Sequence, residues 1–265
     1  MWIDSHSHLN DDAFRDDYRK VIEDMVAQNV EAVIVPGYDL PSSERAVELA
    51  ANEPRLWAAV GIHPHDAKLW DSKTVGRMER LLREPKVVAV GEIGLDYHYN
   101  HSSKEEQIAV FEAQLHLAGQ YNKPVIIHNR EAHQDTLEIL TRFSTRQSPI
   151  TRKTGPSGGW GVMHCYGGSL ETANQCLKLG LLISFAGSIT FTNAAKLREV
   201  AEKLPLSKLL VETDAPYLSP HPFRGRRNEP SRVSVIGAKL ADIKGLAVEE
   251  VMEATTANSR ELFKI

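Results

Sequence analysis

The feature that most constrains the fold is a regular alternation of short apolar runs with longer amphipathic stretches. Eight apolar runs have the length and composition of β-strands, at residues 1–6, 31–37, 57–63, 86–94, 123–129, 161–167, 181–187 and 208–216. Helical periodicity appears between them, for example at residues 15–29, 42–53, 104–122, 169–180 and 193–205. Strands that alternate with helices predict a parallel sheet with helical crossovers.

Eight such units in 265 residues favour a closed (β/α)8 barrel of the TIM type, which needs about 250 residues. An open doubly wound sheet is the alternative. No glycine-rich dinucleotide or phosphate-binding fingerprint follows the first run, and this disfavours the open sheet. Two further helices are expected at roughly 231–244 and 247–263. We therefore expect residues 1–265 to form one barrel domain of the α/β class with extra C-terminal helices.

Charge and cysteine content narrow the class of protein. The net charge of −4 provides no general attraction for an anionic partner, so a protein that coats duplex DNA is disfavoured, whereas an enzyme acting at a nucleic-acid end is not. Two cysteines make no disulfide framework and fit a reducing cytosol. No signal core follows Met1 and no apolar run is long enough to span a membrane. We expect a cytoplasmic monomer without membrane contact.

Metal-binding side chains stand near the carboxyl-terminal ends of the predicted strands. The set is His6, His8, Glu92, His128, His164 and Asp214. A barrel brings these strand ends to one face, and residues two apart on a strand point the same way. Four imidazoles and two carboxylates exceed the needs of one tetrahedral ion. They suit two divalent ions about 3.5–4 Å apart, with Glu92, central in strand order, as the bridge.

Each part of this pattern also has an ordinary structural explanation. A His-x-His pair occurs on many surface strands, and a single histidine at a strand end is commonly a hydrogen-bonded core residue. Glu92 alone could be a structural acid in an ion pair. The coincidence of ligand types at the ends of five separate strands favours the metal site.

Several other residues are candidates for substrate contact. His63 and His65 are assigned to this role because the six-residue set already suffices for the metals. Arg130 is expected to meet an anion at the mouth of the barrel, or to form an exposed ion pair. Arg224 and its neighbours could bind phosphate bidentately or form a solvated basic loop. Cys165 is expected to point away from His164 as a buried apolar residue.

Six segments in order resemble the TatD family of metal-dependent deoxyribonucleases, which belongs to the amidohydrolase-like barrels. They read WIDSHSHLN, GIHPH, GEIGLDY, HNREA, HCYGG and ETDAPYLSP, and they span essentially the whole chain. Many family members have Phe and Ser after the cysteine of HCYGG. The loop at 144–161 looks longer than usual and is expected to restrict or extend substrate contact. Neither difference touches a predicted ligand.

The resemblance implies a role for each matching position. One metal would be held by His6, His8, Glu92 and Asp214, and the second by Glu92, His128 and His164. His63 would contact the scissile phosphate. The segment RRNEP resembles the part of the family that approaches substrate, which gives Asn228 a binding role.

The implied reaction is hydrolysis of DNA phosphodiester bonds, stepwise from a 3′ end, with preference for single-stranded or frayed DNA. Asp214 would accept the proton of the attacking water, while Glu212 lies deeper as a structural acid. Positive charge from the metals, His63 and the arginines would stabilise the dianionic transition state. The histidine-rich ligand set suits Zn, Mn, Fe or Ni, whereas the family is associated with Mg, which prefers more oxygen ligands. We therefore expect two divalent ions, Mg, Mn or Zn.

Two other functions remain open from the sequence. The same ligands can activate water against an amide, a lactone or a phosphotriester, as in a small-molecule amidohydrolase or phosphoesterase. A metal-loaded protein without catalysis could also serve as an assembly partner.

Overall fold

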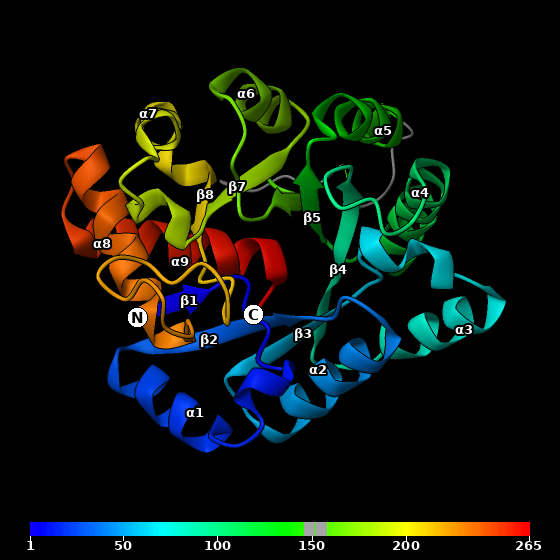
Figure 1. Ribbon diagram of the computed structural model, residues 1–265, viewed down its shortest axis with the longest axis horizontal. Helices are drawn as coiled ribbons and strands as arrows, with labels where there is room; N and C mark the ends of the chain where they lie inside the picture. The colour runs from blue at the N-terminus through cyan, green and yellow to red at the C-terminus, as the bar shows by residue number, and fades with distance from the viewer. Residues whose placement is uncertain (146–150, 152–157) are drawn as a thin grey trace.

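The eight predicted strands form one parallel sheet in a computed structural model that describes residues 1–145, 151 and 158–265. The strands are β1 (Trp2–Asp4), β2 (Val30–Pro36), β3 (Leu56–Val60), β4 (Val87–Asp96), β5 (Val125–Arg130), β6 (Gly161–Met163), β7 (Leu181–Phe185) and β8 (Leu209–Val211). They pair in chain order from β1 to β8 and curve into a nearly closed barrel (Figure 1). This order confirms the predicted barrel, because a doubly wound sheet reverses its strand order at a switch point.

Hydrogen bonds from the segment that follows β1 to β8 and to the segment after β8 join the two ends of the sheet. The Ser5 amide donates to the Val211 carbonyl at 3.2 Å, and the His8 amide donates to the Ala215 carbonyl at 2.7 Å. The seam therefore continues past the ends of both strands and passes beside the predicted metal ligands.

Nine α-helices in the described part of the chain surround the strands (Figure 1). They are α1 (Tyr18–Ala27), α2 (Leu40–Asn52), α3 (Ser72–Leu81), α4 (Lys104–Tyr121), α5 (His133–Thr145), α6 (Leu170–Lys178), α7 (Ala195–Lys203), α8 (Val233–Lys244) and α9 (Val248–Phe263). Short 3-10 helices are η1 (Asp12–Phe14), η2 (Pro64–Leu69), η3 (Gly187–Thr190), η4 (Leu206–Lys208) and η5 (Pro230–Arg232). The two helices expected near the C-terminus are α8 and α9.

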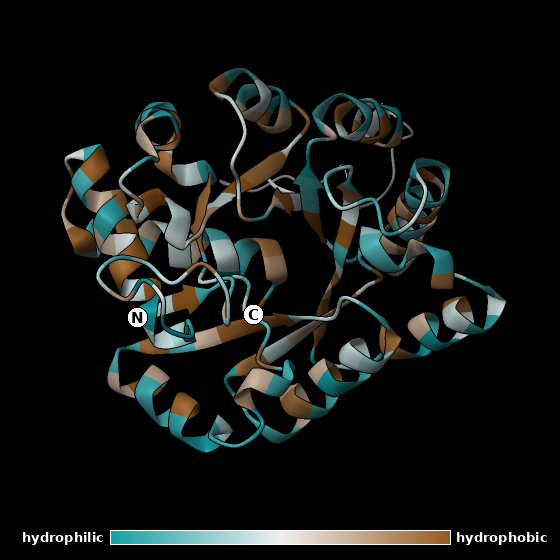
Figure 2. Cartoon of the chain, viewed as in Figure 1, coloured by the Kyte–Doolittle hydropathy of each residue, from teal (hydrophilic) through white to brown (hydrophobic). Residues whose placement is uncertain are grey.

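Helix α4 illustrates how local sequence determines these elements. Ser103 and Glu106 form a reciprocal capping box, in which each side chain accepts a hydrogen bond from the other residue's amide. Phe111, Leu115 and Ala118 form the buried face that the three- and four-residue spacing predicts. Hydrophobic residues lie on the strands and on the helix faces turned toward them (Figure 2).

The barrel interior has an apolar layer beneath a polar one. Residues from seven strands pack with the end of α9: Ile34, Ala59, Ala89, Ile126, Val162, Leu182, Leu210, Leu262 and Phe263. Alternate residues of a strand share a face. The residues two positions after Ile126, Val162 and Leu210 therefore belong to the polar layer above this apolar one. These positions are His128, His164 and Glu212. The fold thus sets polar groups above a closed hydrophobic floor.

No helix in the described ranges is both long and apolar enough to cross a membrane. Most of the predicted loop at 144–161 lies outside the described residues, at 146–150 and 152–157.

Candidate metal centre

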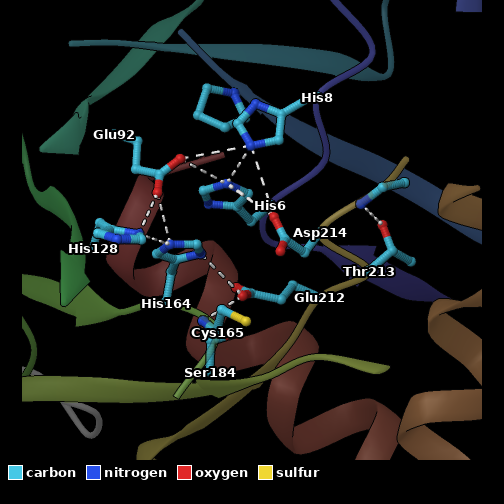
Figure 3. A network of polar contacts seen from close by, with 12 residues as sticks. His6, His8, Glu92, His128, His164, Cys165, Ser184, Glu212, Thr213 and Asp214 are labelled. Carbon is cyan, nitrogen blue, oxygen red and sulfur yellow. Dashed lines mark hydrogen bonds and ion pairs between the residues drawn. The ribbon is translucent and has the colours of Figure 1, made fainter. Parts of the chain in front are cut away.

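The six predicted metal ligands converge at the carboxyl-terminal face of the barrel (Figure 3). Glu92 lies within β4 and His128 within β5, whereas the other four follow the ends of β1, β6 and β8. Segments far apart in the sequence therefore supply side chains to one small volume, as the barrel topology predicts.

One oxygen of Glu92 faces the histidines that follow β1. Oε2 lies 3.4 Å from His6 Nε2 and 3.6 Å from His8 Nε2. These two nitrogens are 3.1 Å apart, and each is 3.7 Å from Asp214 Oδ1. Four donor atoms thus surround one position.

The other oxygen of Glu92 faces a separate group. Oε1 lies 3.0 Å from His128 Nδ1 and 2.8 Å from His164 Nε2. The two oxygens of one carboxylate therefore face two different pairs of histidines, which is the arrangement that a bridging ligand requires.

Glu92 is ionised in this environment. Only 4% of the residue is exposed, and burial by itself raises the pKa of a carboxyl group. His164, together with the hydrogen bond from His128, opposes the effect of burial and holds the pKa of Glu92 well below its usual range. The free-energy cost of burying this carboxylate within β4 is offset by the imidazoles around it.

His63 is oriented as a hydrogen-bond donor. Its Nδ1 accepts the amide proton of His65 at 3.2 Å, so the neutral ring carries its proton on Nε2, which lies 3.5 Å from Glu92 Oε1. Burial and the neighbouring His128 hold the pKa of His63 well below its usual range. The expectation that His63 contributes positive charge is therefore wrong, because the ring is neutral. It can donate one hydrogen bond from Nε2.

Asp96 orients two histidines and was not predicted from the sequence. Its Oδ2 lies 3.0 Å from His65 Nε2 and 3.0 Å from His128 Nε2. Burial opposes ionisation, but the hydrogen bond from His128 and the Tyr99 amide lower the pKa of Asp96 below its usual range. The carboxylate accepts a hydrogen bond from His128 Nε2, and this contact would leave the lone pair of Nδ1 for a metal ion in the loaded protein. Asp96 follows Glu92 by four residues, so in a regular strand the two side chains lie on the same face. This spacing was the sequence signal that could have identified Asp96 as part of the site.

Glu212 lies beneath His164. It is fully buried, accepts the Cys165 amide at 2.5 Å on Oε1, and lies 3.3 Å from His164 Nδ1. The carboxylate faces one nitrogen of the His164 ring, and the other nitrogen, Nε2, lies 2.8 Å from Glu92 Oε1. The geometry agrees with the expectation that Glu212 is the deeper acid of its pair.

Asp214 lies at the mouth rather than in β8, which ends at Val211. Its backbone has a φ of 56°, and its amide donates to the His6 carbonyl at 2.9 Å. Burial raises the pKa of Asp214 to about 6, although His6 and His164 oppose the shift. A neighbouring contact spans the same seam, where the buried carboxylate of Asp4 accepts the Thr213 amide at 2.8 Å.

A cavity of about 850 Å³ opens above these groups. The expected substrate contacts His63, His65 and Arg130 line it, together with Tyr38, Tyr99, Cys165 and Tyr217. Arg130 is the only lysine or arginine among the described residues of this lining.

The expectation for Cys165 was wrong. The residue is only partly buried and lines the cavity, with a φ of 45°. Strand β6 ends at Met163, so the alternation of side chains does not extend to Cys165. Burial, with the nearby Asp214, raises the pKa of its thiol well above the ordinary value.

The structure does not bring Arg224 and Asn228 to the cavity. Arg224 donates to the Ser219 carbonyl at 2.9 Å and lies 3.8 Å from the centroid of the Phe191 ring. Asn228 is fully buried and donates to the Thr213 carbonyl at 2.8 Å. Their polar groups hold the segment after β8 in place, so the substrate-binding roles expected for both residues find no support in this geometry.

A family model described as TatD related DNase matches residues 3–264. The chain belongs to the TatD family. The metal-dependent hydrolase YabD of Bacillus subtilis is 41% identical over 265 residues, covering 100% of both chains. The 3′-5′ ssDNA/RNA exonuclease TatD of Klebsiella pneumoniae is 36% identical and covers 97% of this chain and 96% of its own length. The crystal structure of the TatD homologue YJJV from Escherichia coli has a TM-score of 0.91 at 33% identity, covering 100% of this chain and 98% of that one.

The chemistry of the donor atoms fits cations. Burial and the proximity of His6 lower the pKa of His8 to about 3, so its ring is neutral and can offer a lone pair. In the part of the chain that the structure describes, three groups of residues have ligand atoms that all lie within 4.8 Å of one another: His6, His8 and Asp214; His63, Glu92 and His128; and His6, His164 and Glu212. In the second set His63 stands where the resemblance places His164, but its Nε2 proton makes His63 the poorer ligand.

Proposed function

We propose that this TatD protein is a metal-dependent deoxyribonuclease that removes nucleotides from the 3′ end of single-stranded DNA, with residues 1–265 acting as one catalytic domain in the cytosol. The observation that carries the proposal is the position of Glu92 between two pairs of histidines, 3.4 and 3.6 Å on one side and 3.0 and 2.8 Å on the other. Membership of the family and the relatives named as 3′-5′ ssDNA/RNA exonucleases support this choice of substrate.

The residues divide between two divalent ions, Mg, Mn or Zn. His6, His8, Glu92 and Asp214 would hold one, and Glu92, His128 and His164 the other. Such ions, when bound, polarise a phosphoryl oxygen and lower the pKa of a coordinated water.

The side chains around the site supply the remaining functions. Asp214, whose pKa is raised to about 6, can take a proton at its carboxylate near neutral pH. His63 Nε2 can donate a hydrogen bond to a phosphoryl oxygen. Arg130 places a guanidinium in the lining of the cavity. Since the whole chain carries a net charge of −4, attraction of an anionic substrate depends on these local groups.

Metal analysis combined with a nuclease assay tests the proposal. The protein would be stripped, reloaded with Mg, Mn or Zn, and given oligonucleotides labelled at the 5′ or the 3′ end. Successive loss of single nucleotides from the 3′ end is expected. Metal-loaded protein that hydrolyses amides, lactones or phosphotriesters and leaves oligonucleotides intact would instead be a small-molecule hydrolase, and one inactive on all of them would fit an assembly partner.

The variant Glu92→Gln tests the bridge. A neutral amide keeps the shape of the side chain but cannot balance two cations, so bound metal and activity should both fall to background while the fold persists. Metal content by mass spectrometry, turnover and circular dichroism measure the three properties. Normal metal content together with normal turnover would exclude the bridging role.

A further inference from the structure

Two exposed tyrosines line the metal cavity. The exposed fractions of Tyr99 and Tyr217 are 51% and 55%, and they are the only aromatic residues among the exposed large hydrophobic residues of the described chain. Both line the cavity that contains Glu92 and Asp214. About half of each tyrosine is therefore open to a ligand in the cavity.

The main-chain amide of each tyrosine is hydrogen-bonded to an acidic residue of the site three positions earlier. The Tyr99 amide donates to Asp96 Oδ1 at 3.1 Å, and the Tyr217 amide donates to the Asp214 carbonyl at 2.9 Å. The backbone of each tyrosine is therefore held by the same short turn that places the acidic residue.

The two turns lie on opposite sides of the barrel. Tyr99 follows β4 and Tyr217 follows β8, and these are the fourth and eighth strands in a closed order of eight. Figure 1 shows β4 and β8 across the barrel from one another. On the β8 side, Tyr217 meets His8 edge-to-face at 6.2 Å between ring centroids. On the β4 side, Tyr99 meets His65 edge-to-face at 5.4 Å. The predicted metal site therefore lies between the two rings.

We propose that Tyr99 and Tyr217 are stacking positions for the two nucleobases that flank the scissile phosphate. The inference rests on the proposed function and adds the residues that recognise the nucleosides. A single strand crossing the mouth would place its phosphate over Glu92 and one base against each tyrosine. Stacking on aromatic rings accepts every base, so it suits an enzyme that removes nucleotides of any sequence in turn.

Arg130 strengthens the position at Tyr99. Its guanidinium carbon lies 4.7 Å from the centroid of the Tyr99 ring. The His101 ring lies nearly parallel to Tyr99, 5.8 Å away and inclined by 4°. Arg130 places a positive charge over the ring, so a base would pack against the exposed part of Tyr99 that Arg130 and His101 do not cover. The same guanidinium could meet the backbone phosphate next to that base.

Binding of oligonucleotides with single abasic positions tests the proposal. The probe is a fluorescent single-stranded oligonucleotide with phosphorothioate linkages, measured by anisotropy in three forms: intact, abasic at the 3′-terminal nucleotide, and abasic at the next. In the parent protein each abasic position should weaken binding roughly 5- to 100-fold, the usual contribution of one stacked base. Tyr99→Ala should weaken the intact probe similarly and remove the penalty for one abasic position, and Tyr217→Ala should do so for the other.

Matched variants separate the ring from its hydroxyl and from its surroundings. Tyr99→Phe and Tyr217→Phe keep the ring and should bind like the parent. Tyr121→Ala is the control, since this partly buried ring lies over Arg83 and is not part of the cavity lining. If both cavity alanine variants bind within twofold of the parent, or keep both abasic penalties, the stacking positions are excluded. If the variants give that result while the parent protein cleaves DNA, only the stacking inference is refuted. If the parent protein neither binds nor cleaves nucleic acid, the proposed function is refuted.

Discussion

At the scale of the residue, the proposed metal position between Glu92, His128 and His164 depends on the tautomer of His128. Asp96 Oδ2 accepts a hydrogen bond from His128 Nε2 at 3.0 Å, while Asp96 Oδ1 accepts hydrogen bonds from the amides of His98 and Tyr99 at 3.0 and 3.1 Å. Both oxygens of the carboxylate therefore act as acceptors. A side chain that replaces Asp96 must accept hydrogen bonds both from His128 Nε2 and from the two main-chain amides. Only then does the lone pair of His128 stay on Nδ1.

Asp96→Asn should break this arrangement. The amide oxygen would remain with the backbone amides, so the NH₂ group would face His128 Nε2 and shift the ring proton to Nδ1. Metal affinity at the His128 position should fall by about 10- to 100-fold, as for other partners of ligating histidines. Titration calorimetry measures the affinity, and ¹⁵N NMR of labelled histidine reports the tautomer. Asp135→Asn is the control, since Asp135 accepts from the Tyr97 hydroxyl at 2.6 Å and does not line the cavity. Unchanged affinity and tautomer in Asp96→Asn would refute the role.

Asp214→Asn should lower turnover by about two to four orders of magnitude, the usual contribution of a positioned general base. Substrate binding should weaken far less, because His6, His8 and Glu92 keep their places. Single-turnover cleavage at saturating metal is the measurement, with Glu212→Gln as the partner variant. If Asp214→Asn cleaves at the parent rate while Glu212→Gln is inactive, the two acids have been assigned the wrong way round.

The raised pKa of Asp214 also predicts how stability depends on pH. Since burial raises it from 3.8 to about 6, the folded metal-free protein binds more protons than the unfolded chain between these values. Stability should therefore fall as the pH rises through this window, by about 1–3 kcal/mol in the free energy of unfolding. Asp214→Asn cannot ionise, so metal-free Asp214→Asn should gain stability relative to the parent at pH 8 but little at pH 4. Urea denaturation at both values is the measurement, and an equal difference at the two would contradict the cause.

At the scale of the element, β4 and β5 approach closely beside the site. Gly94 has a φ of 141°, and a Cβ at this position would overlap the His128 carbonyl oxygen. The register between these strands shifts between Val90 and Ile93, on either side of Glu92. Gly94 is therefore required for the strands to place Glu92 and His128 together.

Gly94→Ala should lower the free energy of unfolding by more than about 1 kcal/mol and weaken metal binding, because both the backbone angle and the contact oppose a side chain. Gly76→Ala is the matched control. A Cβ at Gly76 in α3 would have no atom within 4 Å, so alanine should add about 0.5–1 kcal/mol of stability. Thermal denaturation and metal titration of both variants are the test. Equal effects at the two positions would contradict it.

Strand alternation predicted the site only where the backbone stays extended. The side chains of His6 and His8 lie on the same side of the chain, as expected. The segment after β1 stays extended there, because Ser7 pairs with Ala215 in the segment after β8. Cys165 broke the expectation, because the chain turns directly after β6. Positive φ values and turns after strands are produced by tertiary contacts that local residue patterns do not encode.

At the scale of the whole molecule, the position of the site favours single-stranded substrates. Glu92 and His164 are only 4% and 7% exposed, at the base of a cavity of about 850 Å³. A flexible strand end can lower its phosphate into such a cavity more readily than a stacked duplex can. Cleavage of single-stranded oligonucleotides and frayed ends should therefore be faster than cleavage of blunt duplex. Equal rates on a nicked circular duplex and a single-stranded oligonucleotide would contradict this prediction.

The barrel and the convergence of its ligands were predictable because they follow from strand order, whereas contacts at the mouth were not. Arg224 and Asn228 looked free to meet a phosphate, yet in the structure they donate to main-chain carbonyls. Tyr217 gave no sequence signal, because its position depends on the turn after β8. Loop side chains depend on how the chain folds back on itself, so their partners cannot be read from spacing.

The seam between the first and last strands has a consequence for synthesis on the ribosome. The Asp4 carboxylate meets Thr213 across 209 positions of sequence. His6 and His8 emerge early in translation, but their partner Asp214 follows only after nearly the whole barrel has been made. At about 5–20 residues per second, this delay is on the order of 10–40 s. During that interval the nascent chain exposes two histidines without the carboxylate that completes their set, and the barrel cannot close. The seam that contains the first residues to be synthesised is therefore the last part of the barrel to fold.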